Sequence, residues 1–236
     1  MSELKIKIYA DGADLDEMVK MDNKNFINGF TTNPTLMAKN GIKDYLGFAK
    51  EVLSHIKDKS ISFEVFSDNL DEMYRQALVL RDLGDNVWVK IPVTNTQSVY
   101  TYDLIHKLSS EGVKINATAL FTKEHIENVY NALNPNINSI ISIFAGRIAN
   151  AGIDPEPTMR FSSELTKDSP LIETLWASSR EVFNIMQAER TNTDIITLPF
   201  SLIKAYKKEV GKDLDEFSLE TVKMFYNDAQ ESGFSL

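Results

Sequence analysis

One lysine, Lys90, stands in the middle of a strand-forming run, NVWVKIPVTN, at residues 86–95. Removing an ammonium group from water is costly, so lysine occupies a buried position only where it is paired or chemically used. Burial lowers the pKa of an amine, and a neutral amine forms a Schiff base with a ketone. Because the resulting iminium draws electrons from a neighbouring bond, Lys90 could support cleavage of a carbon–carbon bond beside a carbonyl.

Such cleavage also needs acid–base groups, and two carboxylates are available. A general base must take the proton of the hydroxyl on the far carbon, and further groups must form and hydrolyse the imine. Asp11 ends one predicted strand and Glu64 lies in another. The alternative is a buried ion pair between Lys90 and Glu64 without a catalytic role, because structural pairs also shift pKa values.

Further polar side chains stand in or at the ends of predicted strands. A single Asp or Asn there is usually a turn or cap residue, but the whole set is harder to explain in that way. Alternate residues of a strand share one face, as Asn116 and Thr118 do. The set consists of Asp11, Thr32, Asn33, Glu64, Lys90, Asn116, Thr118 and Ser142. We therefore expect these side chains to converge on one site.

Two arginines follow neighbouring strands. Arg147 follows one predicted strand, and Ser178 and Arg180 follow the next. The loops after the last strands of barrels commonly bind phosphate, and a guanidinium group offers phosphate two parallel donors. A surface ion pair is the alternative for each arginine. Their positions after adjacent strands favour a phosphate site and hence a phosphorylated sugar.

The elements that would position these residues alternate along the chain. Short β-branched runs alternate with longer amphipathic runs, which is typical of an α/β protein with a parallel sheet. We expect eight strands, at residues 5–11, 28–33, 60–66, 86–93, 113–120, 139–146, 171–178 and 193–199. This pattern predicts one (β/α)8 TIM barrel domain over residues 1–236, with its active site at the C-terminal ends of the strands. An open doubly wound sheet is the alternative, but no glycine-rich phosphate loop follows any strand.

Residues 213–234 predict one further amphipathic helix after the barrel. Its apolar residues require a partner surface. A lid over apolar surface of the barrel is one interpretation, and a contact between subunits is the other.

Charge and composition argue against several classes of function. The chain has 34 acidic and 25 basic residues, a net charge of -9 and no local basic patch, which opposes binding to nucleic acid or anionic membrane. It lacks cysteine, and its three histidines have no metal-ligand spacing, so we expect neither a metal nor a cofactor. We expect a cytoplasmic protein, because the sequence has no signal-peptide core and no apolar run near the roughly 20 residues of a membrane span.

Taken together, the motifs resemble the transaldolase family of class I aldolases, specifically its short, single-domain branch that includes fructose-6-phosphate aldolase. TTNP, VKIP and FxGR at these spacings are the strongest joint signal, and the matching segments occur in the family's order across most of the chain. These segments are ADGAD (10–14), GFTTNPTL (29–36), FEVF (63–66), VKIPVT (89–94), NATALF (116–121), SIFAGRI (142–148), WASSR (176–180) and ITLP (196–199).

The resemblance implies a role for each site residue. Lys90 would be the Schiff-base lysine, and Asp11 would deprotonate the hydroxyl of the donor sugar. Glu64 and Thr118 would hold the water used in imine formation and hydrolysis. The substrate-binding residues would be Thr32, Asn33, Asn116, Ser142 and Phe144, with Arg147, Ser178 and Arg180 on the phosphate. The resemblance also implies a homo-oligomer, a pentamer or decamer, and a place in the pentose phosphate pathway.

Two positions divide this branch of the family. Members that release free dihydroxyacetone tend to carry Gln at the Glu64 position and Tyr at the Phe144 position, so the pair in this chain favours transfer to an acceptor sugar. Ser179 and the two prolines of IANAGIDPEP (148–157) depart from the family pattern beside the phosphate loops. A lyase that releases dihydroxyacetone or acts on a deoxy- or sulfo-sugar is therefore the second hypothesis. A barrel that binds sugar phosphates without turnover is the third.

Overall fold

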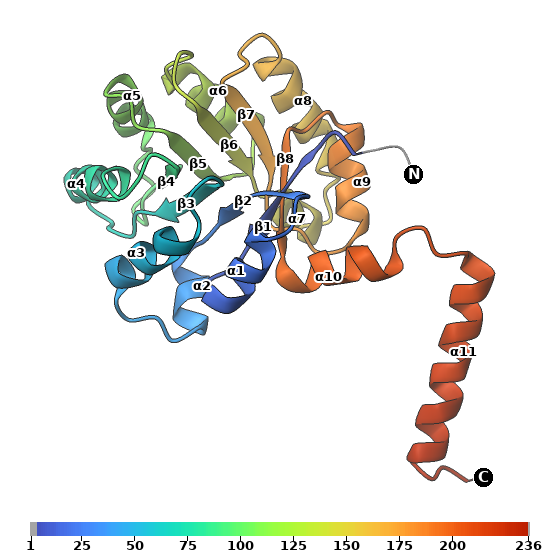
Figure 1. Cartoon of the computed structure of the whole chain (residues 1–236). Helices are drawn as coiled ribbons and strands as arrows, with labels where there is room; N and C mark the ends of the chain where they lie inside the picture. The colour runs from blue at the N-terminus through green and yellow to red at the C-terminus, as the bar shows by residue number, and fades with distance from the viewer. Residues whose placement is uncertain (1–3, 236) are drawn as a thin grey trace.

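The structure, a computed structural model, describes residues 4–235. Within that range, eight parallel strands form a closed barrel in which each strand pairs with its neighbours in sequence and the last pairs with the first (Figure 1). The (β/α)8 TIM barrel prediction is therefore confirmed. The strands are β1 (Lys7–Asp11), β2 (Ile27–Thr31), β3 (Ser60–Glu64), β4 (Val87–Pro92), β5 (Ile115–Leu120), β6 (Ser139–Ile143), β7 (Ile172–Trp176) and β8 (Ile195–Pro199).

Helices α1 to α10 surround the barrel, two after β2, two after β6 and one after each other strand, and α11 follows α10. Side-chain caps begin several of them; Asn33 and Asn69 each accept a hydrogen bond from a backbone N–H of the first turn of α2 and α4. The helices are α1 (Leu15–Asp22), α2 (Pro34–Lys39), α3 (Tyr45–His55), α4 (Leu70–Arg81), α5 (Tyr102–Ser110), α6 (Lys123–Ala132), α7 (Ala145–Asn150), α8 (Glu156–Thr166), α9 (Phe183–Arg190), α10 (Phe200–Glu209) and α11 (Leu214–Glu231).

Strand residues alternate between the helices outside the barrel and the barrel interior. On β4, Val89 and Ile91 pack into the main core between strands and helices, whereas Trp88 packs against a second cluster inside the barrel. The inner cluster consists of Tyr9, Ile140, Leu175, Ala177 and Ile195. Lys90 shares its strand face with Trp88, so the pleat of β4 directs the lysine into the interior.

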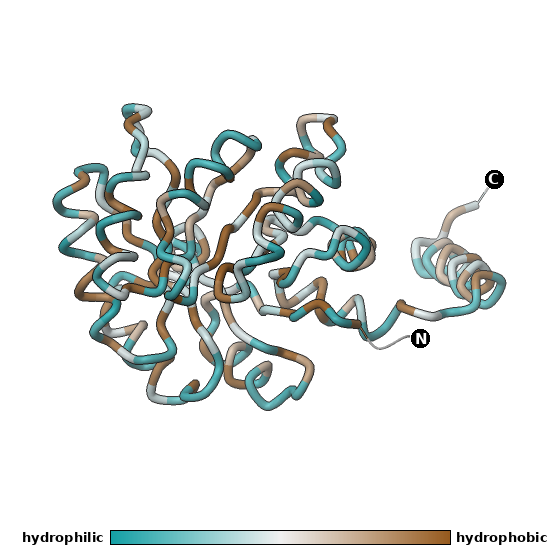
Figure 2. The backbone as a smooth tube through the Cα atoms, turned by 90° about the horizontal axis from the view of Figure 1, so that it is seen from above, coloured by the Kyte–Doolittle hydropathy of each residue, from teal (hydrophilic) through white to brown (hydrophobic). Residues whose placement is uncertain are grey.

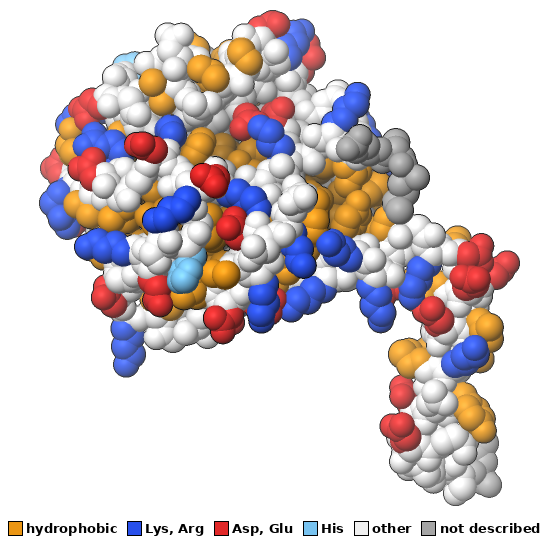
Figure 3. Space-filling model, viewed as in Figure 1, with side chains coloured by type: hydrophobic (Ala, Val, Ile, Leu, Met, Phe, Trp, Pro, Cys, Tyr) orange, Lys and Arg blue, Asp and Glu red, His pale blue; other side chains and the backbone are white. Residues whose placement is uncertain are grey.

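The C-terminal helix α11 stands away from the barrel (Figure 1, Figure 2). None of its residues is buried, and its apolar side chains are exposed, among them Val222, Phe225 and Tyr226 (Figure 3). The predicted helix within 213–234 is confirmed, but the interpretation as a lid is wrong, because α11 covers no surface of its own barrel. Among residues 4–235, no helix combines the length and the apolar composition that a membrane span requires.

Candidate active site

A cavity of about 450 Å³ opens at the C-terminal ends of the strands. Because the strands are parallel, their C-terminal ends meet at one face of the barrel. The wall is formed by Asp11, Thr31, Asn33, Thr35, Leu36, Glu64, Lys90, Thr118, Ala119, Ser142, Phe144, Arg147, Ala177, Ser178, Arg180 and Thr197. The cavity thus brings together every predicted site residue except Thr32 and Asn116, which are fully buried.

Lys90 is the one charged residue among the buried side chains of residues 4–235, with 6% of its surface exposed. Its Nζ lies 3.1 Å from Oε2 of Glu64 and donates to the backbone oxygen of Thr32 at 2.9 Å. An ammonium group has three donors, so one is left for the cavity that Lys90 lines. The ion pair with Glu64 exists, and it gives the lysine an adjacent acceptor for the proton that it must lose to become a nucleophile.

Asp11 ends β1 and faces the same cavity. The hydroxyl of Thr31 donates to Oδ1 of Asp11 at 2.7 Å. Burial raises the pKa of the Asp11 carboxyl above its ordinary value, although the charge of Lys90 and the hydrogen bond from Thr31 act in the opposite direction. A carboxylate with a raised pKa is a stronger base, which suits it to remove a proton from a hydroxyl group.

Two residues of β5 carry buried polar atoms without a partner. The hydroxyl of Thr118 faces the cavity and has no hydrogen-bond partner within residues 4–235. Asn116 donates through Nδ2 to Oγ of Ser62 at 3.0 Å, while its Oδ1 is unpartnered in the same described range. Buried polar atoms are almost always hydrogen-bonded in folded proteins, so these two atoms require a bound water or a ligand.

Thr32 and Asn33 are adjacent in sequence, but only the side chain of Asn33 lines the cavity. The hydroxyl of Thr32 donates to the backbone oxygen of Ser62, and the side chain does not line the cavity. Asn33 lines the cavity and uses Oδ1 to accept from the N–H of Leu36, which leaves its Nδ2 group for a ligand. Thr32 therefore contacts Lys90 only through its backbone oxygen.

Close packing of α7 against the loop after β7 brings the two arginines to one wall of the cavity. A Cβ atom built on Gly146 would stand 1.7 Å from the backbone oxygen of Ser178, so only glycine fits where α7 meets the loop after β7. Arg147 follows Gly146, with its Cζ 5.5 Å from the ring centre of Phe144. Ser178 adopts a positive φ of 63° at the start of the loop that carries Arg180.

Arg147 and Arg180 have no carboxylate within ion-pair distance in the described part of the chain. In the amide orientation that satisfies both of its polar atoms, Asn150 donates to the backbone oxygen of Gly146 at 3.1 Å and accepts from Nη2 of Arg180 at 3.3 Å. Neither arginine therefore forms the surface ion pair that the sequence left open. Two guanidinium groups without a carboxylate partner on one cavity wall have the charge and the donors that suit an anion.

Nearly the whole chain matches one protein family. The pattern of the Transaldolase/Fructose-6-phosphate aldolase family covers residues 8–236. The chain belongs to this family. Curated relatives named probable transaldolase include a protein of Thermoplasma volcanium, 32% identical over 215 residues (88% of this chain, 91% of that one), and one of Novosphingobium aromaticivorans, 33% identical over 210 residues (88% and 92%). This transaldolase/fructose-6-phosphate aldolase family member is thus an aldolase-type enzyme.

A structural comparison bears on the fold alone. A putative isomerase from Sinorhizobium meliloti superposes with a TM-score of 0.62 at 10% sequence identity. The match covers 87% of this chain and 55% of that longer chain. Barrels of this kind carry many unrelated chemistries, so the likeness adds nothing on the reaction of this family member.

Sequence reasoning missed four polar residues near the site of this aldolase-family barrel, one of which is Thr35 in the first turn of α2. Thr31 is the last residue of β2 and has the same parity as Asn33, the N-cap of α2, so parity along the extended chain would have favoured Thr31 over Thr32. Thr197 faces the cavity from β8, and Asn150 lies in α7 beside Arg180. No charge or motif spacing marked the last two, because their partners come from distant parts of the chain.

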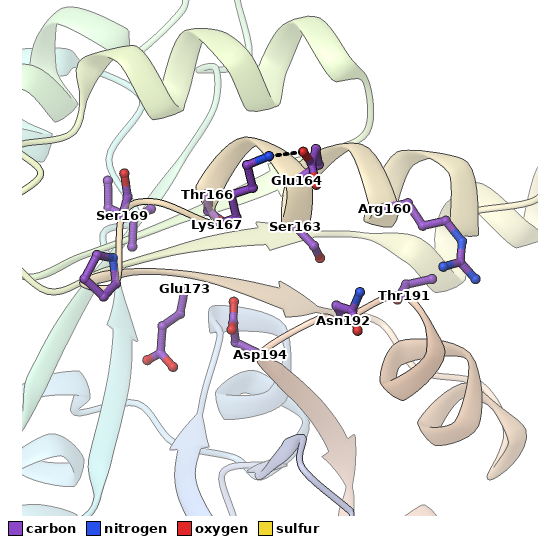
Figure 4. A pocket seen from close by; sticks show the side chains of 12 residues that line it. Arg160, Ser163, Glu164, Thr166, Lys167, Ser169, Glu173, Thr191, Asn192 and Asp194 are labelled. Atoms are coloured by element: carbon purple, nitrogen blue, oxygen red, sulfur yellow. Dashed lines mark hydrogen bonds and ion pairs between the residues drawn. The ribbon is translucent and has the colours of Figure 1, made fainter.

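A second pocket lies at the opposite end of the barrel, near the starts of β7 and β8 (Figure 4). Its charged groups are already satisfied: Lys167 pairs with Glu164, Arg160 pairs with Glu156, and Asp194 accepts two hydrogen bonds from Thr174. No group of His, Cys, Asp or Glu suited to a metal ion occurs among residues 4–235. The cavity at the C-terminal ends is therefore the candidate active site of this family member.

Proposed function

We propose that the protein is a transaldolase that moves a three-carbon dihydroxyacetone unit from a ketose phosphate to an aldose phosphate. The observation that carries the proposal is a buried amine, Lys90, paired with Glu64 in a cavity that also holds Asp11 and two arginines without carboxylate partners in the described chain. A Schiff base on Lys90 supplies the electron sink itself, so the reaction needs no cofactor. We place the reaction in the pentose phosphate pathway and in the cytoplasm.

The first step forms the Schiff base. Lys90 gives a proton to Glu64 across their 3.1 Å contact, and the neutral Nζ attacks the ketone carbon of the donor. The carbinolamine then loses its hydroxyl as water, with the proton returned from Glu64, and an iminium remains. The unpartnered hydroxyl of Thr118 is the hydrogen-bond partner for this water and for the water that later hydrolyses the imine.

The second step breaks a carbon–carbon bond. Asp11, as the carboxylate, takes the proton of the hydroxyl on the far carbon of the bond that breaks, and that carbon becomes the aldehyde. The electron pair of that bond moves into the iminium, which leaves an enamine on Lys90 and releases an aldose phosphate. The raised pKa of Asp11 favours this proton transfer.

The third step transfers the three-carbon unit to an acceptor sugar. The enamine carbon attacks the aldehyde of a second aldose phosphate, and Asp11 gives its proton to the alkoxide that forms. Hydrolysis of the new iminium releases the product ketose and restores Lys90. Nδ2 of Asn33 in the cavity wall is the group that we assign to a donor hydroxyl, with Ser142 and Phe144 beside it. Asn116 does not line the cavity, so we assign its unpartnered amide oxygen to a donor hydroxyl reached directly or through one water.

We assign the phosphate groups of donor and acceptor to the cavity wall that carries Arg147 and Arg180. Arg147 and Arg180 supply charged donors, and the hydroxyl of Ser178 lies in the same wall. Guanidinium groups favour phosphate because they offer two N–H donors in one plane.

A lyase that releases dihydroxyacetone, or that acts on a deoxy- or sulfo-sugar, is the alternative activity. Ser179, where the family often has Phe, supports this alternative activity. Its side chain is buried and donates to the backbone oxygen of Thr197 beside the cavity, so the departure from the family pattern lies near the substrate site. Comparing product formation with and without an acceptor aldehyde separates release from transfer.

The experiment that tests the Schiff base is reductive trapping. Fructose 6-phosphate and sodium borohydride should attach a sugar adduct to the wild-type chain, and Lys90→Met should take up none. Lys167→Met, which removes a surface lysine from the opposite end of the barrel, is the matched control and should trap sugar normally. Trapping on Lys90→Met at the wild-type level would exclude this mechanism. Intact ligand after long incubation, with normal binding, would favour a barrel that only binds sugar phosphates.

We also propose that the enzyme is a homo-oligomer in which α11 of one copy packs on the barrel of the next. An apolar groove lies beside α10 and the start of β1, lined in part by Ile6, Phe26, Met186, Tyr206 and Val210. The described lining of this groove also carries three lysines and no carboxylate, although Lys7 already pairs with Glu173. By contrast, α11 has five acidic residues and one basic residue. Apolar contact and opposite charge therefore both favour this pairing.

A further inference from the structure

Two threonine hydroxyls form a line behind the Asp11 carboxyl. Oγ1 of Thr31 lies 2.7 Å from Oδ1 of Asp11, and Oγ1 of Thr197 lies 2.6 Å from Oγ1 of Thr31. Both threonines are buried, with 3% and 5% of their surfaces exposed, and both line the cavity. The proposed reaction steps assign no task to either hydroxyl.

The number of protons fixes the direction of these hydrogen bonds when Asp11 is charged. A carboxylate can only accept, so Thr31 must donate its single proton to Asp11. Thr31 then has no proton left for the 2.6 Å contact, and Thr197 must be the donor there. All the donors of the line therefore point toward Asp11.

The same three groups can reverse this order when Asp11 is protonated. A carboxylic acid is a donor, and a hydroxyl group can accept as well as donate. The proton on Oδ1 of Asp11 then points to Thr31, and the proton of Thr31 points to Thr197. No heavy atom has to move, because both contacts have a length that suits either direction.

We propose that Thr31 and Thr197 are positioning residues whose hydroxyls reorient with each proton transfer and hold the Asp11 carboxyl in one place in both of its protonation states. This inference rests on the proposed role of Asp11 as the base that takes a proton and later returns it. A partner that only donates, such as a lysine or a backbone N–H, would stabilise the carboxylate alone.

The barrel holds these hydroxyls on rigid elements. Thr31 of β2 pairs in register with Asp11 of β1, and Thr197 of β8 pairs with Tyr9 on the other side of β1. Threonine is branched at Cβ, which restricts its side-chain rotamers and fixes the direction of the hydroxyl. The closure of β8 onto β1 therefore brings the second hydroxyl to the first.

Removal of one hydroxyl with its shape retained tests the proposal. Thr197→Val should lower the rate of carbon–carbon cleavage about tenfold and move the acidic limb of its pH profile upward, since Thr31 becomes a weaker donor to the carboxylate. Thr31→Val should show a larger effect, of roughly a hundredfold, because Asp11 then loses its hydrogen bond altogether. Thr197→Ser and Thr31→Ser, which keep the hydroxyl, should recover most of the rate.

Reductive trapping on Lys90 separates this inference from the proposed function. All four variants should trap sugar at the wild-type rate, because the contact between Lys90 and Glu64 does not involve the threonines. A Thr197→Val enzyme with the cleavage rate and pH profile of the wild type would overturn the inference while leaving Lys90 as the Schiff-base lysine. Serine variants as slow as the valine variants would also overturn it, and the two Thr197 variants are sufficient for this test even if Thr31→Val fails to fold.

Discussion

Gly146 and Ser178 lie so close together that the first residue has no room for a side chain. A Cβ on Gly146 would stand 1.7 Å from the backbone oxygen of Ser178. This contact joins α7, which carries Arg147, to the loop that carries Arg180. The spacing of the two guanidinium groups therefore depends on a residue that does not itself line the cavity.

Gly146→Ala should disturb the cavity wall that carries Arg147 and Arg180 and should also lower the stability of the fold. The loop after β7 must move to admit the methyl group, at a cost of about 1–3 kcal/mol in the free energy of unfolding. Chemical denaturation would measure that loss, and KM for fructose 6-phosphate should rise more than KM for unphosphorylated fructose. Gly84→Ala, whose added Cβ would have its nearest neighbour at 3.1 Å, is the control and should leave both KM values unchanged.

Arg147→Gln and Arg180→Gln should each weaken binding of the phosphorylated sugar. Loss of charged hydrogen bonds to phosphate predicts a rise in KM of roughly tenfold to a hundredfold for each substitution. Steady-state kinetics with phosphorylated and unphosphorylated ketoses would measure the difference. Arg160→Gln, at the opposite end of the barrel, should change neither value. An equal loss with both classes of sugar would contradict a phosphate site.

Asp11→Asn should stabilise the protein at neutral pH while it abolishes cleavage. Burial raises the folded pKa of Asp11 above 3.8, so the folded state binds this proton more tightly than the unfolded state does. The contribution of Asp11 to stability therefore falls as pH rises from 3.8 through the folded pKa. Thermal unfolding should give a higher Tm for the variant at neutral pH, and the difference should shrink as pH falls through that window.

Asp11→Asn should lose carbon–carbon cleavage but keep formation of the Schiff base on Lys90. Carbon–carbon cleavage should fall by roughly 10² to 10⁴, because the variant lacks the proposed general base. Borohydride trapping should persist, since Lys90 and Glu64 are unchanged. A Tm difference that is independent of pH would show that the Asp11 charge does not oppose folding.

Phe144→Tyr should increase release of dihydroxyacetone relative to transfer. The ring of Phe144 lines the cavity and carries no acidic proton, whereas a phenol there could protonate the enamine and end the reaction before an acceptor binds. Free dihydroxyacetone formed without acceptor would measure the change. Phe121→Tyr, at a ring 5.8 Å from that of Phe144 and outside the cavity wall, is the matched control. Equal release from both variants would argue against a role for position 144.

Phe225→Glu should dissociate the proposed oligomer. Its side chain lies on the apolar side of α11 with 62% of its surface exposed, so a charge there opposes packing on a second barrel and leaves the single chain undisturbed. Light scattering would report a smaller particle than for the wild type. Asn227→Glu, on the polar side of α11, should keep the wild-type mass. A Phe225→Glu particle of wild-type mass would place the subunit contact elsewhere.

Local patterns in the sequence predicted the barrel and much of the site. Alternation along β4 already directs Lys90 inward, because successive strand residues face opposite sides whatever the partners are. The same alternation, continued from β2 into the two residues that follow it, selects Thr31 and Asn33 and rejects Thr32. The Thr32 hydroxyl donates to the backbone oxygen of Ser62 and lies outside the cavity wall. Such inferences succeed because they depend only on backbone geometry between near neighbours.

The sequence by itself therefore determined the order of strands and helices, the inward lysine and the membership of a family. Only the tertiary structure decided that Thr197 meets Thr31, that both arginines lack a carboxylate within residues 4–235, and that α11 leaves its own barrel. These outcomes depend on contacts between segments far apart in the chain, and on the register with which β8 closes against β1. An amphipathic pattern indicates that the apolar side of a helix such as α11 needs a partner surface. The three-dimensional path of the chain decides which surface can contact that side.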